Sequence, residues 1–176
     1  MNQVILLNSR PVGRPKLTDF QFVSEENPVI ESGEIMLKTS YVSVDPYLRG
    51  RMNDAKSYAA PFELQKPIQS GAIAEVVESK HPQFQTGDYV SGMMEWKEYQ
   101  KSNGERLYKV DANKAPLSAY LGVLGMTGLT AYLGLSEIGK LKESETVVVS
   151  GAAGAVGSVA GMSATVVPAR SGMMTG

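Results

Sequence analysis

Residues 146–161, which read "TVVVSGAAGAVGSVAG", decide the fold of the second part of the chain. The run "TVVVS" at the start of this stretch is apolar on both faces, which is typical of a strand buried in a parallel sheet. Closely spaced glycines follow directly, which is typical of a nucleotide-binding turn that connects such a strand to the next helix. The stretch therefore predicts the start of an α/β domain.

The glycine spacing is a variant of the dinucleotide-binding fingerprint Gly-x-Gly-x-x-Gly. Gly154 and Gly157 fit its second and third positions, and Ala152 takes the first. The backbone amides of Gly154, Ala155 and Val156 would then face a phosphate at a helix N-terminus, where unpaired N–H groups and the helix dipole favour an anion. An ordinary glycine-rich β-to-α turn without a ligand is the alternative interpretation.

The residues after this turn favour NADP over NAD. In an NAD site an acidic residue about twenty positions on holds the ribose 2′-OH, but no Asp or Glu follows Glu145. Arg170 is a candidate partner for a 2′-phosphate. Residues 158–163 are too short for a crossover helix, which with its connections takes at least ~10–12 residues, and residues 164–172 resemble a second strand that arrives early. Two explanations are open: either the helix has been shortened, or residues 162–176 are a foreign or frame-changed end on a truncated form of the chain, which is the interpretation we favour.

The first part of the chain has the period-two pattern and turn residues of short strands. Three runs predict strands: "EIMLKTSYVSVD" (34–45), "GAIAEVVES" (71–79) and "DYVSGMMEWKEYQ" (88–100). Short strands at this spacing suggest a small barrel or sandwich, and no fixed repeat indicates a solenoid. We expect this part of the molecule to be mainly β.

A helical segment separates the two parts, beginning near Pro116. Four apolar side chains suit one face of a helix, with Gly139 near its stop: Leu129, Tyr132, Leu133 and Ile138. The charged segment "KLKESE" after that stop is typical of an exposed link to the strand that follows.

Composition excludes several classes of function. The net charge is −1 without blocks of like charge, so nucleic acid is not an expected partner. The chain has no cysteine, which excludes disulfides, thiolate nucleophiles and Cys-containing zinc sites. The only histidine, His81, lies in a polar segment and is expected to be a solvated loop residue. Because the start lacks a signal-peptide pattern and no run approaches ~18 apolar residues, we expect no membrane partner and a cytoplasmic location.

Taken in order, five motifs resemble the zinc-independent, NADP-dependent medium-chain dehydrogenase/reductases. Within that family they are most similar to the alkenal double-bond reductases, which include leukotriene B4 dehydrogenase/prostaglandin reductase and curcumin reductase. The resemblance covers about residues 1–161. The motifs are "NSRPVGRP" (8–15), "VSVDPYLRGRMND" (42–54), residues 57–90, "LGVLGMTGLTAYLGL" (121–135) and "VVVSGAAGAVGSVAG" (147–161).

The resemblance implies a GroES-like β-barrel domain followed by a Rossmann domain. On this sequence it implies a GroES-like catalytic domain over 1–120, then a hinge helix and an incomplete NADP-binding Rossmann domain over 121–176. It also accounts for the missing Cys and His ligands, because this branch of the family has no zinc. The implied activity is NADPH-dependent reduction of the C=C bond of an α,β-unsaturated carbonyl, in a homo-oligomer that is expected to be a dimer.

The family's functional positions fall on two groups of residues. Tyr47 and Arg51 lie in the substrate-pocket segment, with Tyr47 also the candidate catalytic residue. The expected cofactor-binding residues are Met126 and Thr127, beside the nicotinamide, and Ala152, Gly154, Ala155, Val156 and Gly157, at the pyrophosphate. Each group has an alternative: Tyr47 packs against the barrel, Arg51 forms a surface ion pair, and Met126 fills the core.

Two other functions remain open from the sequence. Quinone reduction needs the same cofactor with a flatter electron acceptor. Alternatively, the chain is a non-catalytic barrel fragment with an unfinished cofactor site. In either case an incomplete sheet would leave residues 146–150 exposed, and this exposure predicts self-association.

Overall fold

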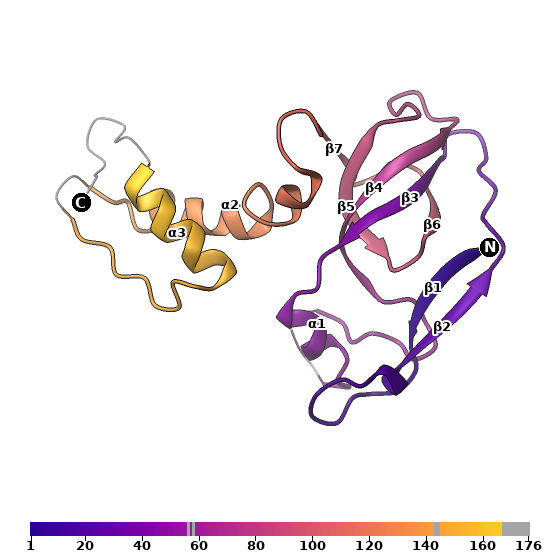
Figure 1. Ribbon diagram of the computed structural model, residues 1–176, viewed down its shortest axis with the longest axis horizontal. Helices are drawn as coiled ribbons and strands as arrows, with labels where there is room; N and C mark the ends of the chain where they lie inside the picture. The colour runs from indigo at the N-terminus through magenta and orange to yellow at the C-terminus, as the bar shows by residue number, and fades with distance from the viewer. Residues whose placement is uncertain (56, 58, 143–144, 167–176) are drawn as a thin grey trace. The chain divides into compact units, whose positions relative to one another are not determined.

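The computed structural model describes residues 1–55, 57, 59–142 and 145–166, which form two compact units (Figure 1). The first, Met1–Leu117, is here called the β unit, and the second, Ser118–Gly176, the helical unit.

The β unit contains two antiparallel sheets. Strand β1 (Asn2–Leu7) pairs with β2 (Phe20–Glu25) to form the smaller sheet. The larger sheet has the order β6-β3-β4-β5-β7, with β3 (Ile35–Val42), β4 (Gln69–Ser79), β5 (Tyr89–Glu95), β6 (Tyr99–Ser102) and β7 (Tyr108–Val110). A short 3₁₀ helix, η1 (Leu17–Asp19), precedes β2, and helix α1 (Pro46–Arg51) follows β3.

Strand β1 joins the two sheets. Its backbone bonds to the segment that precedes β4 and to the segment that follows β5, with the Leu7 amide 3.1 Å from the Lys66 carbonyl and the Ile5 amide 2.9 Å from the Trp96 carbonyl. The fully buried Asn2 donates from its side chain to the Tyr99 carbonyl at 2.7 Å. These bonds close the strands into the barrel-like domain that the sequence predicts.

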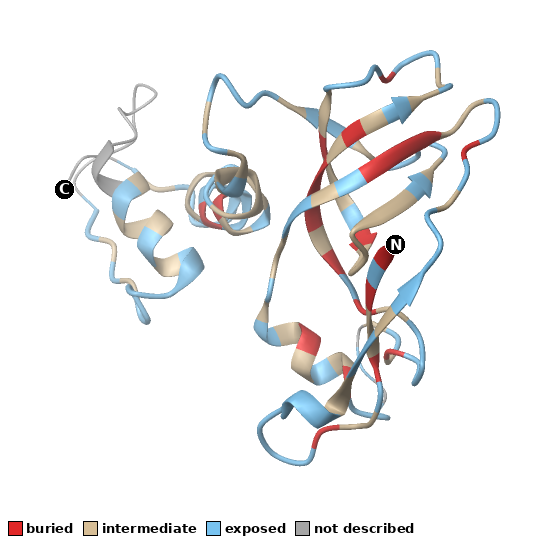
Figure 2. Ribbon diagram, turned by 45° about the vertical axis from the view of Figure 1, so that its right-hand side comes forward, coloured by how far each residue is buried: buried red, intermediate tan, exposed pale blue. Residues whose placement is uncertain are grey.

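Two apolar clusters form the core of the β unit. The first lies on the larger sheet and contains Ile35, Leu37, Ala72, Ala74, Val76, Phe84, Val90 and Met94. The second lies between strand β1 and helix α1 and contains Leu7, Leu48, Met52, Phe62 and Ile68. Figure 2 shows that the buried residues gather along the strands and on α1. The second cluster therefore fixes the place of the helix that carries the predicted substrate residues.

The three predicted strand runs are confirmed, with one difference. Residues 34–45 and 71–79 contain β3 and β4, but residues 88–100 divide into β5 and β6. Residues 96–98 separate the two strands and bond to β1 as well as to β3: the Glu98 amide lies 2.9 Å from the Gln3 carbonyl, and the Glu98 carbonyl accepts from the Thr39 amide at 2.9 Å. A period-two pattern does not reveal this change of partner.

The described part of the helical unit contains helices and turns. The 3₁₀ helix η2 (Leu117–Leu121) leads into α2 (Met126–Leu133), which continues as the π-helical turn η3 (Gly134–Ile138), and α3 (Ala155–Val166) packs against α2. The predicted helix and its stop at Gly139 are confirmed, but the apolar side chains expected on one face are exposed in this unit. No helix among the described residues is long and apolar enough to cross a membrane.

Two expectations about the end of the chain are wrong. Residues 146–150 form no strand, and the Val148 side chain is 90% exposed. A parallel strand needs neighbours for its backbone hydrogen bonds, and the described part of the helical unit supplies none. Helix α3 extends to Val166, so the helix after the turn is longer than residues 158–163 and residues 164–166 are not a second strand. Arg170 lies outside the described residues.

Candidate functional site

Helix α1 carries the two predicted substrate residues, Tyr47 and Arg51. The helix begins after Asp45, whose carboxylate accepts a hydrogen bond from the Ser43 hydroxyl at 2.7 Å, and Pro46 lies in its first turn. Proline suits this position because an N–H there has no intrahelical partner and because its φ is already helical. The motif "DPYLRGR" therefore starts this helix by its own local chemistry.

Tyr47 packs against the second core cluster. Its side chain is partly buried, and it lies against the cluster that contains Leu48 and Phe62. A packed ring has few rotamers available to it, so the phenol is held in a defined place. The packing role given as the alternative for Tyr47 is thus present, and it would also orient the hydroxyl for binding.

Arg51 is fixed across the loop that follows the helix. Its Nε donates to the Ala60 carbonyl at 2.9 Å, and its guanidinium carbon lies 4.0 Å from the centre of the Phe62 ring. The Phe62 amide in turn donates to the Arg51 carbonyl at 2.7 Å. Among the described residues Arg51 forms no ion pair, so the surface ion pair considered for it is absent there.

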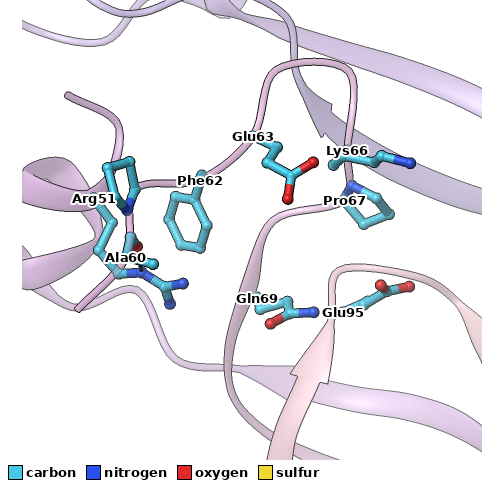
Figure 3. Close-up of a pocket in the computed structure, with 9 residues that line it drawn as sticks. Arg51, Ala60, Phe62, Glu63, Lys66, Pro67, Gln69 and Glu95 are labelled. Atoms are coloured by element: carbon cyan, nitrogen blue, oxygen red, sulfur yellow. Dashed lines mark hydrogen bonds between the residues drawn. The ribbon is translucent and has the colours of Figure 1, made fainter. Parts of the chain in front are cut away.

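A surface pocket of about 420 Å³ opens beside Arg51 (Figure 3). Its wall consists of the loop after α1 and the facing ends of β4 and β5, with Arg51, Ala60, Pro61, Phe62, Glu63, Lys66, Pro67, Gln69 and Glu95. Charged groups of both signs and one aromatic ring therefore face the same space. Such a lining suits a small polar molecule with an apolar part.

One acidic side chain of the pocket is already paired. Glu95 lies 3.0 Å from the Nζ of Lys97, which also lies 3.3 Å from Glu25. Burial on its own lowers the pKa of Lys97, but the hydrogen bonds and charges of Glu95 and Glu25 outweigh it and raise that pKa. Lys97 is therefore cationic at neutral pH and offsets the charge of Glu95 at the pocket.

Met126 and Thr127 form the first turn of α2. The Thr127 hydroxyl donates to the Gly122 carbonyl at 2.8 Å, while the Met126 side chain is 70% exposed. A Cβ on Gly128 would lie 1.7 Å from the Val123 carbonyl oxygen, so only glycine allows the preceding turn to approach the helix this closely. Because Met126 is exposed, the core-filling role considered for it is absent in the described unit.

The turn before α3 depends on glycine at two positions, 151 and 157. Gly151 has a φ of +67°, which favours glycine, and the Gly154 amide donates back to the Gly151 carbonyl at 2.8 Å. The Gly154 amide was expected to face a phosphate, but this bond already uses it. A Cβ on Gly157 would lie 2.4 Å from that same carbonyl oxygen. Glycine at 157 therefore lets the helix pack directly on the turn, which is the role of the third glycine in the fingerprint.

The turn leaves backbone donors at the start of α3. The Ser158 amide bonds to the Gly154 carbonyl at 2.9 Å, so the amides of Ala155, Val156 and Gly157 precede the first intrahelical bond. Ala152, Gly154 and these first helical residues lie at the surface or close to it. An exposed helix N-terminus whose first amides have no bond to any residue that the structure describes fits a phosphate, and no side chain on the glycines obstructs it.

The predicted residues lie in two places. Tyr47 and Arg51 share α1 in the β unit, and the predicted cofactor residues belong to the helical unit, where α2 and α3 contact each other. Sequence reasoning missed Phe62, Glu95 and the left-handed role of Gly151. A glycine directly after the apolar run was the available signal for Gly151, whereas the contacts of Phe62 and Glu95 are long-range.

Comparison with known proteins extends these observations. Residues 3–110 match a family model described as the N-terminal domain of oxidoreductase. The chain is 54% identical over 168 residues to the putative NADP-dependent oxidoreductase YfmJ of Bacillus subtilis, a match that covers 96% of this chain and 49% of that protein. It is 42% identical over 160 residues to the NADPH-dependent curcumin reductase of Escherichia coli, with 91% of this chain and 46% of that protein covered.

Solved structures give the same result. The crystal structure of CurA from Vibrio vulnificus matches with a TM-score of 0.83 and 42% identity, covering 92% of this chain and 48% of that chain. CurA from Vibrio vulnificus in complex with NADPH matches with a TM-score of 0.82 and 42% identity, covering 90% and 47%. The chain thus spans about half the length of the curated relatives and of these structures.

Proposed function

The chain belongs to the family of oxidoreductase N-terminal domains, and we propose that a full-length protein carrying it reduces the C=C bond of α,β-unsaturated carbonyls with NADPH. The similarity to the Escherichia coli NADPH-dependent curcumin reductase and to the 2-alkenal reductase (NADP(+)-dependent) of Nicotiana tabacum supports this activity. The observation that carries the proposal is the turn before α3, whose glycines and unpaired amides suit a dinucleotide.

The cofactor would be held at the two helix starts of the helical unit. The amides of Ala155, Val156 and Gly157 would bind the pyrophosphate, while Met126 and Thr127 at the start of α2 would lie beside the nicotinamide. When bound, NADPH supplies a hydride to the β-carbon of the conjugated double bond. Any residue that holds the ribose 2′-phosphate lies outside this set.

The substrate would be held by the β unit. The Tyr47 hydroxyl would donate a hydrogen bond to the substrate carbonyl oxygen, whose negative charge rises as the β-carbon receives hydride. A proton then adds at the α-carbon, which gives the saturated carbonyl. Arg51 and the pocket beside it would accommodate the remainder of the molecule.

The first test is a calorimetric titration of the 176-residue chain with NADPH, with NADH as the comparison. Micromolar binding that favours NADPH is the expected result. Equal binding of both cofactors would count against the preference for NADPH, and absent binding would count against a cofactor site in this chain. In a full-length protein, rates on an alkenal and on a quinone should differ in favour of the alkenal, and preference for the quinone would overturn the proposed substrate.

A further inference from the structure

Helix α1 is too short to be stable by itself. It has six residues and no side-chain hydrogen bond at its N-cap, whereas isolated helices below roughly 12–15 residues are marginal in water. Leu48 within the helix and Met52 directly after it are buried in the second core cluster. Arginine side chains that donate to backbone carbonyls give the helix further support.

Arg49 connects the helix to the loop that precedes η1. Its Nη2 donates to the Pro11 carbonyl at 2.8 Å and to the Gly13 carbonyl at 3.0 Å, and its Nε lies 3.1 Å from the same Gly13 oxygen. Its Nη1 donates to the Asn53 side chain at 2.6 Å. All three guanidinium nitrogens therefore donate hydrogen bonds: Nε and Nη2 to the loop, and Nη1 to Asn53 just after the helix.

Arg10 makes the reciprocal connection from the loop to the helix. Its Nη1 donates to the Met52 carbonyl at 2.9 Å, which satisfies a carbonyl at the helix C-terminus, and its Nη2 lies 3.9 Å from Asp54. Gly13, with a φ of +73°, forms the turn that presents the loop carbonyls to Arg49. The loop and the helix thus hold each other through two arginines.

We propose that Arg49 and Arg10 are positioning residues, which set where α1 places Tyr47 relative to the substrate. This inference rests on the proposed function of Tyr47. Arg49 lies two residues after Tyr47 on the same helix, so movement of the helix on the loop moves the phenol with it. Lysine cannot replace Arg49, because a single ammonium group lacks the planar fork that reaches both loop carbonyls and Asn53 together.

The first arm of the test measures local opening in the 176-residue chain. In the Arg49→Lys variant the amides of Met52 and Asn53 should exchange hydrogen about 10- to 100-fold faster, as expected for lost charge-assisted hydrogen bonds. Arg14→Lys is the matched control, because Arg14 is exposed in the same loop and forms no hydrogen bond or ion pair with the residues that the structure describes. Equal exchange in the two variants would overturn the connection.

The second arm separates positioning from general stability by a double-mutant cycle in a full-length protein. Arg49→Lys should lower kcat on an enone about 10- to 100-fold, as expected for misplacement of a catalytic group by about 1 Å, and should leave the KM for NADPH unchanged. In a Tyr47→Phe background the same substitution should have almost no further effect. Equal losses in both backgrounds would refute positioning of Tyr47. Absence of enone turnover in every variant would refute the proposed function, while hydrogen exchange would still decide the connection.

Discussion

Replacing Gly157 by alanine tests the close approach of α3 to its turn. The added Cβ would lie 2.4 Å from the Gly151 carbonyl oxygen, 3.0 Å from the Gly151 carbonyl carbon and 3.1 Å from the Ala152 Cα. All three are backbone atoms, so no side chain can rotate away from the new methyl group. The turn and the helix must therefore move apart.

The magnitude follows from these distances. Ordinary contact with a Cβ begins at 3.4 Å, so the turn must move by 1.0 Å, the difference between 3.4 and 2.4 Å. Overpacking of this kind costs about 1–3 kcal/mol, and the better helix propensity of alanine offsets up to about 1 kcal/mol of it. A displaced amide loses a hydrogen bond to the pyrophosphate worth about 1.5–3 kcal/mol, so NADPH should bind about 10- to 100-fold more weakly.

Gly161→Ala in the same helix is the matched control. A Cβ on Gly161 meets nothing within 4 Å, so this variant should bind NADPH as the wild type does and gain up to about 1 kcal/mol of stability. Calorimetric titration with NADPH measures binding in a full-length protein, and chemical unfolding followed by circular dichroism measures stability. Equal NADPH affinity in the two variants would refute the role assigned to the turn amides.

Two further predictions concern charge and exposure. Asp88 accepts hydrogen bonds from Lys109 at 2.6 Å and from the Gln85 amide at 2.8 Å, and these lower its pKa below the ordinary value of 3.8. The charged Asp88 therefore stabilises the fold above its ordinary pKa, and this stabilisation is lost as the pH falls through the lower pKa of the folded state. Between about pH 6 and pH 3, the free energy of unfolding should therefore fall more in the wild type than in Asp88→Asn. A difference between the two proteins that does not change with pH would contradict this. The exposed Val148 should promote self-association, which Val148→Lys should reduce in sedimentation experiments; a clean wild-type monomer at high concentration would oppose it.

Local patterns predicted the elements that are stabilised locally. The alternation around Ile35 and Leu37 identified β3, and both residues are buried in the first core cluster. The glycine spacing identified the start of α3, because the steric demand at Gly157 is set by a carbonyl only six residues earlier. In each case the physical cause lies within a few residues of the signal.

Elements that depend on distant partners were not predictable in the same way. Residues 146–150 have a strand composition, but a strand forms only where a neighbour supplies hydrogen bonds. Arg49 donates mainly to backbone carbonyls, and these carry no sequence signature, so its contacts with Pro11 and Gly13 could not be read from the motif "PYLRGRM". The family resemblance identified the motif, and only the structure explains this arginine.

The bond between Asn2 and Tyr99 has a consequence for synthesis of the protein. Asn2 is synthesised before the residue whose carbonyl it contacts, which lies 97 positions later in the chain. At about 5–20 residues per second, that partner is made roughly 5–20 s afterwards. Before then the first strand can pair with β2 and with the segment around Lys66, but its bonds to residues 96–99 cannot form, so the nascent domain cannot complete its contacts before translation has passed Tyr99. We therefore expect folding of this domain to be limited by a late step that follows the synthesis of β6.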